Sequence, residues 1–210
     1  MNEDLIKYIK IYIFPLYDKN DRSHRLWHIT GVIERSLSIA KDYDVNLDMV
    51  YTIAAFHDVG NHVSRDSHEI ESAKLFLKDK KMKLFFDEDQ IQIIKEAIED
   101  HRASLTYEHR NIYGKIIATA DKFLTIDDIL KSVHLYTLEN FPNINWEESL
   151  DRCYKYLNNK YGENGYASIP LAFPPYYNFL IEIRKLIKDK GKLNIALKQV
   201  DTNIKEDNME

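Results

Sequence analysis

The apolar residues of this chain recur mostly at steps of three and four, which is the spacing of amphipathic helices. In residues 24–43, for example, Leu26, Ile29, Ile33 and Leu37 would form one inward-facing stripe. No segment shows the sustained alternation of a half-buried strand. The pattern predicts helices over about residues 5–13, 24–43, 48–59, 68–78, 89–105, 110–139, 146–161 and 176–188.

Polar residues at the ends of these segments supply start and stop signals. Asn145 with Glu148 has the spacing of a capping box, and so does Asp66 with Glu69. Ser23 is a candidate N-cap for the helix over 24–43. Residues 162–175 hold two Gly and three Pro, which favours a loop. A short hairpin in that loop stays an alternative.

Taken together, these elements predict an all-α fold. We expect one helical domain over residues 1–190, whose core spans about residues 24–130. Residues 191–210 are more polar and are predicted to form a flexible C-terminal tail.

Composition narrows the classes of protein. The 210 residues include 29 Lys+Arg and 34 Asp+Glu, for a formal net charge of −5, which does not favour binding to a nucleic acid polymer. The single cysteine, Cys153, excludes an intramolecular disulfide framework and a zinc site with four thiolates. The apolar runs are too short to span a bilayer, and residues 1–10 do not resemble a signal peptide. We therefore expect a cytoplasmic protein.

The strongest local signal is an imidazole and a carboxylate, His57 and Asp58, at the end of an apolar helical segment. The small residues Ala54 and Ala55 precede them and allow neighbouring helices to approach closely. A buried imidazole beside a buried carboxylate is costly unless each finds a partner. That partner is either a shared cation or a hydrogen-bonding group on the next helix, and the pair alone does not distinguish them.

Two further residues in apolar helical settings favour the cation. His28 lies within the stripe of the second predicted helix, and Asp121 follows the apolar segment 116–120. A buried aspartate needs a strong reason. Two imidazoles and two carboxylates suit a divalent ion such as Mn, Fe, Co, Ni or Mg, with positions left for water and substrate. The predicted metal ligands are His28, His57, Asp58 and Asp121.

This ordered set, with the sequence Ala-Ala-Phe-His-Asp-Val-Gly around the pair, resembles the HD-domain superfamily of metal-dependent phosphohydrolases. The resemblance covers about residues 24–130. It implies an HD-domain helical bundle with additional C-terminal helices, in which His28, the His57–Asp58 pair and Asp121 bind the metal. Many members carry an arginine where this chain has Gly31. Its contact would then be absent or supplied by another residue, such as Arg25 or Arg35.

Several other residues are candidates for further roles at this site. His68 and His101 are candidates for a second metal or for substrate phosphate, and their number matches a dinuclear member of the superfamily. Asp58 and Glu69 are the candidate catalytic residues, Glu69 as a general acid or as a partner of a ligand histidine. Lys122, Arg25 and Arg102 are candidates for binding substrate phosphate. The remaining histidines, His24, His62, His109 and His134, are assigned to surface or helix-end positions.

The expected activity is hydrolysis of a phosphate ester or anhydride by a metal-activated water, with a nucleotide as the expected small-molecule substrate. A di-iron oxygenase of the same superfamily and a non-catalytic nucleotide-sensing module with a structural metal stay open, as does an interaction protein without metal. The sequence does not indicate whether phosphate or pyrophosphate is released, nor the oligomeric state.

Overall fold

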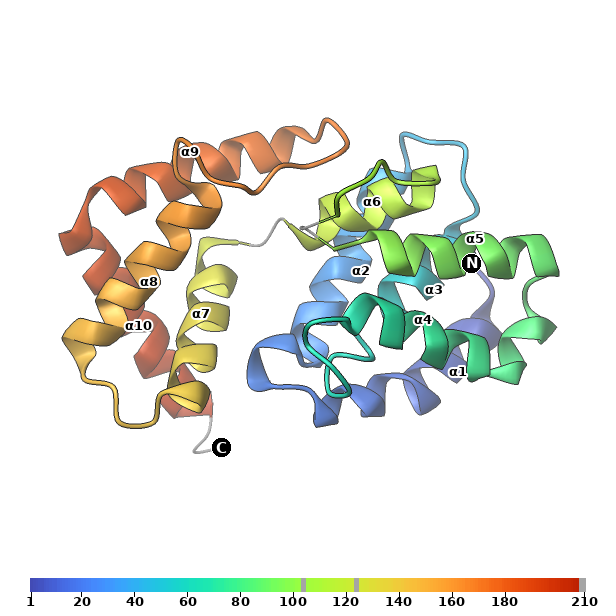
Figure 1. Ribbon diagram of the computed structural model, residues 1–210, viewed down its shortest axis with the longest axis horizontal. Coiled ribbons are helices and arrows are strands. Elements are labelled where there is room, and N and C mark those ends of the chain that lie inside the picture. The colour runs from blue at the N-terminus through green and yellow to red at the C-terminus, as the bar shows by residue number, and fades with distance from the viewer. Residues whose placement is uncertain (103–104, 123–124, 208–210) are drawn as a thin grey trace. The chain divides into compact units, whose positions relative to one another are not determined.

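The computed structural model describes residues 1–102, 105–122 and 125–207. These residues form α-helices and short 3₁₀-helices, and no strand occurs among them (Figure 1). The all-α prediction is therefore confirmed. Within the described residues the contacts divide the chain into two compact units, rather than the one domain expected over residues 1–190.

The first unit comprises residues 1–122 and 169–172. Its centre is the helix α3, Leu47–Phe56, in which every residue from Met49 to Phe56 is buried. Such a helix is apolar on all sides because other helices surround it, here α2, α5 and α6. The other elements are α1 (Glu3–Tyr12), η1 (Phe14–Lys19), η2 (Arg22–His24), α2 (Leu26–Ala40), α4 (His68–Lys78), η3 (Lys80–Leu84), α5 (Glu88–Asp100) and α6 (Ile112–Asp121).

The second unit comprises residues 123–168 and 173–210, and holds α7 (Ile126–Asn140), α8 (Trp146–Tyr161), α9 (Pro174–Lys188) and α10 (Lys190–Asp207) (Figure 1). The expected tail is wrong for residues 191–207, because they belong to α10. Leu193, Leu197, Val200 and Ile204 are buried at helical spacing, and α10 packs on α7, α8 and α9. Residues 208–210 lie outside the described residues.

Several predicted boundaries also differ. The long helix expected over 110–139 ends at Asp121, and α7 begins at Ile126 after the N-cap Thr125; residues 123–124 lie outside the described part of the chain. Ser23 lies in η2 and does not cap α2. The capping box at Asn145 is confirmed, whereas α4 follows Ser67 without a side-chain cap.

Candidate metal centre

Six imidazole and carboxylate side chains converge inside the first unit. They come from the first turn of α2, the turn after α3, the start of α4, the end of α5 and the end of α6. Helix ends bring their side chains together here although the residues are far apart in sequence. The six are His28, His57, Asp58, His68, His101 and Asp121.

The four predicted metal ligands form the first group. The Nε2 atom of His28 lies 3.2 Å from Asp121 Oδ1 and 3.8 Å from Asp58 Oδ2. The Nε2 atom of His57 lies 3.5 Å from Asp58 Oδ2 and 3.7 Å from Asp121 Oδ1. His57 is completely buried, and Asp121 is the most exposed member, with 24% of its side chain accessible. The group is therefore open to solvent on the Asp121 side.

A second group uses the other oxygen of Asp58. Asp58 Oδ1 lies 3.5 Å from the Nε2 atoms of both His68 and His101, which are 3.2 Å apart from each other. Asp58 thus lies between the two groups and turns one carboxylate oxygen toward each. The structure brings together the two histidines whose roles the sequence left open.

Backbone carbonyls orient three of the imidazoles. Nδ1 of His57 donates to Ala54 O at 2.8 Å, and Nδ1 of His101 donates to Ile98 O at 2.6 Å. Nδ1 of His68 lies 3.0 Å from the carbonyl of Arg65. Because a carbonyl only accepts, these contacts place the proton on Nδ1 and leave Nε2 facing the cluster. This is the arrangement in which histidine serves as a metal ligand.

The electrostatics keep both carboxylates ionised. Burial alone would raise their pKa values, but the facing imidazoles hold the pKa of Asp58 and that of Asp121 well below the usual range. Burial lowers the pKa of His28, which keeps it neutral. Burial also tends to lower the pKa of His57, but the nearby carboxylates of Asp58 and Asp121 have the larger effect and raise this pKa to about 9. A cation at this place would displace that proton.

The residues present fit a divalent cation. The Nε2 atoms of His28 and His57 are buried and make no hydrogen bond with any residue that the structure describes. Orphaned buried nitrogens are costly, and a cation would satisfy both. Nitrogen and carboxylate oxygen atoms within 4.8 Å of one another occur in two sets, one of His28, His57 and Asp58, the other of Asp58, His68 and His101. The buried cluster is compatible with metal binding.

Two candidates lie next to His68: Glu69, a candidate catalytic residue, and Arg102, a candidate for binding substrate phosphate. The carboxylate of Glu69 is 3.5 Å from Nδ1 of His68, the ring nitrogen that faces away from the cluster. Arg102 Nη1 lies 3.2 Å from Glu69 Oε1 and also donates to the carbonyl of Asp66. Glu69 therefore lies beside His68, and its role stays a prediction.

The other two basic candidates differ in position. The side chain of Arg25 is exposed at the N-cap of α2, and no interaction between it and the cluster occurs among the described residues. Lys122 directly follows Asp121 at the C-cap of α6 and is buried, with 6% exposure. Burial lowers the pKa of His109, and the charge of Lys122 lowers it further.

Arg35 occupies the space that Gly31 leaves free. A Cβ atom on Gly31 would lie 2.9 Å from Nη1 of Arg35, so the guanidinium passes directly over this glycine. Nε of Arg35 donates to the carbonyl of Ala120 at 2.9 Å, next to Asp121. An arginine one turn later therefore reaches the helix end that carries Asp121.

Sequence reasoning missed the surroundings of the cluster. The ring of His24 lies 5.8 Å from that of His28, and its Nδ1 is 2.9 Å from Asp21 Oδ1, so His24 is not an incidental surface residue. His134 is buried and pairs with Asp201 in the second unit, so its surface assignment is wrong. Asn20 is buried beside the cluster. Its position after Pro15 and before the second helix carries no motif that would have identified it.

The comparison with protein families agrees with the geometry. Residues 25–126 match the HD domain family, and this span contains all six residues of the cluster. The chain contains an HD domain. No curated protein matches the chain, and neither does any solved structure. The expected family is confirmed, and its members are mostly metal-dependent phosphohydrolases.

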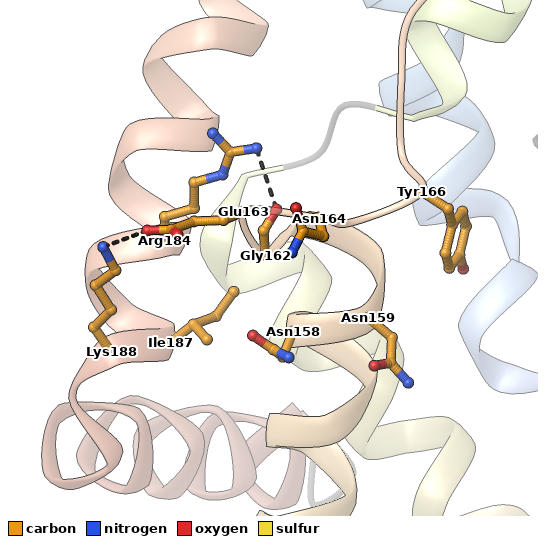
Figure 2. Close-up of a pocket in the computed structure, with 9 residues that line it drawn as sticks. All are labelled: Asn158, Asn159, Gly162, Glu163, Asn164, Tyr166, Arg184, Ile187 and Lys188. Atoms are coloured by element: carbon orange, nitrogen blue, oxygen red, sulfur yellow. Dashed lines mark hydrogen bonds and ion pairs between the residues drawn. The ribbon is translucent and has the colours of Figure 1, made fainter.

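A separate hollow lies in the second unit. Its volume is about 570 Å³, and Figure 2 shows Arg184, Glu163 and Lys188 on its wall. Arg184 donates to the backbone carbonyls of Tyr161 and Gly162, and Lys188 pairs with Glu163. None of the predicted site residues lines this hollow.

Among the described residues, no helix combines the length and apolar character that a bilayer crossing requires.

Proposed function

We propose that this chain is a metal-dependent phosphohydrolase that cleaves a phosphate ester or anhydride, with a nucleotide as the substrate. The observation that carries the proposal is the position of Asp58, whose two oxygens face two separate sets of imidazoles. We propose two cation positions that share this carboxylate. One would use His28, His57, Asp58 and Asp121, and the other Asp58, His68 and His101.

When bound, divalent cations at these positions supply a Lewis acid for a phosphoryl oxygen and lower the pKa of a water molecule. Asp58 would orient that water with its carboxylate. The carbonyl of Arg65 would keep His68 in the ligand tautomer by accepting from Nδ1, and Glu69, 3.5 Å from the same nitrogen, would stabilise the ring electrostatically. Arg102 directly follows His101 in the sequence, and Lys122 directly follows Asp121. We propose that both side chains contact the substrate phosphate. Arg25, exposed at the start of α2, would act further out.

The test is release of phosphate or pyrophosphate from a panel of nucleotides in the presence of Mn²⁺, Co²⁺, Ni²⁺ or Mg²⁺. We expect turnover with at least one metal, and a loss of about 1,000-fold or more in Asp58→Ala, comparable to the loss of a major electrostatic group. Asp151→Ala is the matched control, because Asp151 lies in α8 with 44% of its side chain accessible and, among the described residues, pairs with the surface lysines Lys155 and Lys190. Full activity in Asp58→Ala would refute the proposal.

The two-set geometry also supports a second candidate, a di-iron oxygenase, because that chemistry needs His68 and His101 as ligands. Iron content and O₂ consumption distinguish it from a hydrolase, and an active iron-free enzyme would eliminate it. A nucleotide-sensing module would instead bind nucleotide tightly without sustained product formation in the same panel.

A further inference from the structure

A buried amide, Asn20, makes hydrogen bonds to the end of η2 and to two residues in the turns over 57–63. Its side chain lies between η1 and η2 and is 3% exposed. Nδ2 donates to the carbonyl of His24 at 3.2 Å and to the carbonyl of Asp58 at 3.0 Å. Oδ1 accepts from the backbone N–H of His62 at 3.0 Å. Two carbonyls and one N–H around the amide leave a single orientation that satisfies all three contacts.

These contacts matter because Asp58 lies outside the regular hydrogen bonding of a helix. The helix α3 ends at Phe56, and residues 57–63 form consecutive turns. The carbonyl of Asp58 accepts from the N–H of Asn61 at 3.1 Å, so Asn20 supplies its second hydrogen bond. The direction of the Asp58 carboxylate therefore depends on a turn that Asn20 holds from outside.

The same amide restrains the segment that leads into α2. His24 is the last residue of η2, and α2 begins two residues later and carries His28 in its first turn. Because both Nδ2 contacts come from one nitrogen, the backbone before His28 and the backbone of Asp58 are held at a fixed separation. The 3.8 Å distance from His28 Nε2 to Asp58 Oδ2 depends on that separation.

We infer that Asn20 is a positioning residue of the metal centre, which sets the Asp58 turn against the start of α2. This inference rests on the proposed function for its consequence, weaker metal binding when Asn20 is lost. The informative variant is Asn20→Asp, which keeps an oxygen acceptor for His62 and removes both donated hydrogen bonds. Asn111→Asp is the matched control: Asn111 caps α6 with Oδ1 and donates from Nδ2 to the carbonyl of Ile93.

The first measurement uses metal-free protein with ¹⁵N-labelled histidine, observed by NMR. Asn20→Asp is expected to shift the ring resonances of His28 and His57, while those of His134 in the second unit stay in place. Asn111→Asp is expected to leave all three in place. Unchanged His28 and His57 rings in Asn20→Asp would overturn the inference. If Asn20→Asp does not fold, Asn20→Ser removes the same donors without adding a charge and is compared in its place.

The second measurement is titration with Mn²⁺, followed by calorimetry, and with Co²⁺, followed by its visible absorption. Loss of an outer-shell partner costs about 10- to 100-fold in metal affinity, so we expect at least about 10-fold weaker binding and an altered Co²⁺ band in the Asn20 variant. A purely structural role would lower the melting temperature and leave the band shape unchanged, which would overturn the inference. Failure of the wild-type chain to bind metal refutes the proposed function instead, and the histidine resonances then decide the role of Asn20 alone.

Discussion

The contact between Gly60 and α4 gives a sharp test of the second ligand group. Gly60 N donates to Ser72 Oγ at 2.9 Å, so the turn after Asp58 packs directly on this helix. A Cβ atom at Gly60 would lie 2.4 Å from Ser72 N and 2.7 Å from the carbonyl carbon of Glu71. Both are backbone atoms and cannot rotate away. In Gly60→Ala the helix must therefore retreat by about 1 Å to reach ordinary contact.

That retreat would affect one ligand group more than the other. The helix α4 carries His68 at its first position, whereas His28 and Asp121 lie on α2 and α6. A displacement of about 1 Å is large against the 3.5 Å between His68 Nε2 and Asp58 Oδ1. Misplacement on this scale costs about 100-fold in rate, and overpacking costs about 1–3 kcal/mol of stability.

The assay compares Gly60→Ala with wild type after dialysis against Mn²⁺. We expect the variant to keep one equivalent of metal in the first group, to lose the second, and to hydrolyse the substrate about 100-fold more slowly. Its melting temperature should fall. Gly191→Ala is the matched control, because within the described part of the chain a Cβ there would meet just one atom, a side-chain oxygen of Asp189 at 3.3 Å. A Gly60→Ala variant with two metal equivalents and normal turnover would show that α4 does not set the position of His68.

Three further predictions follow from buried charges. In metal-free protein the pKa of His57 is raised to about 9, against about 6.5 in the unfolded chain, which stabilises the fold by about 3 kcal/mol. This stabilisation is fully present below pH 6.5 and is lost as the pH rises through 9. Urea unfolding measures it, and a free energy of unfolding that stays constant between about pH 6 and 9 would contradict the prediction. Asp58→Asn should remove most of that pH dependence and both metal equivalents, measured by elemental analysis; retention of either would count against the shared carboxylate. Asp100 is completely buried and accepts hydrogen bonds from Tyr107 Oη and from three nitrogens of Arg110. We therefore expect Asp100→Asn to lower the free energy of unfolding, measured in urea, by about 3 kcal/mol or more. A decrease below about 1 kcal/mol would refute this prediction.

Local patterns in the sequence were sufficient for the helical class and for naming four side chains that the structure brings together, whose role as metal ligands stays a prediction. Helical spacing and capping depend on residues three or four apart, and for this reason the Asn145 capping box and most helix positions were predictable. The pair His57–Asp58 stood out because polar groups at the end of an apolar helix need a partner. His28 and Asp121 were found by the same reasoning, since each lies in an apolar helical segment.

Contacts between distant segments were outside the reach of such patterns. The burial of α10 depends on its packing against α7, α8 and α9, which its weak amphipathic pattern does not describe. That Asp58 turns its oxygens to two sides could not be predicted, because His68 and His101 are 33 residues apart and meet only when α4 packs on α5. The hydrogen bond from Arg35 to Ala120 and those of Asn20 to Asp58 and His62 likewise join residues 38 to 85 positions apart. The sequence by itself determined which residues could bind a cation; the tertiary structure decided how they are grouped, because grouping depends on packing between helices rather than on spacing within one.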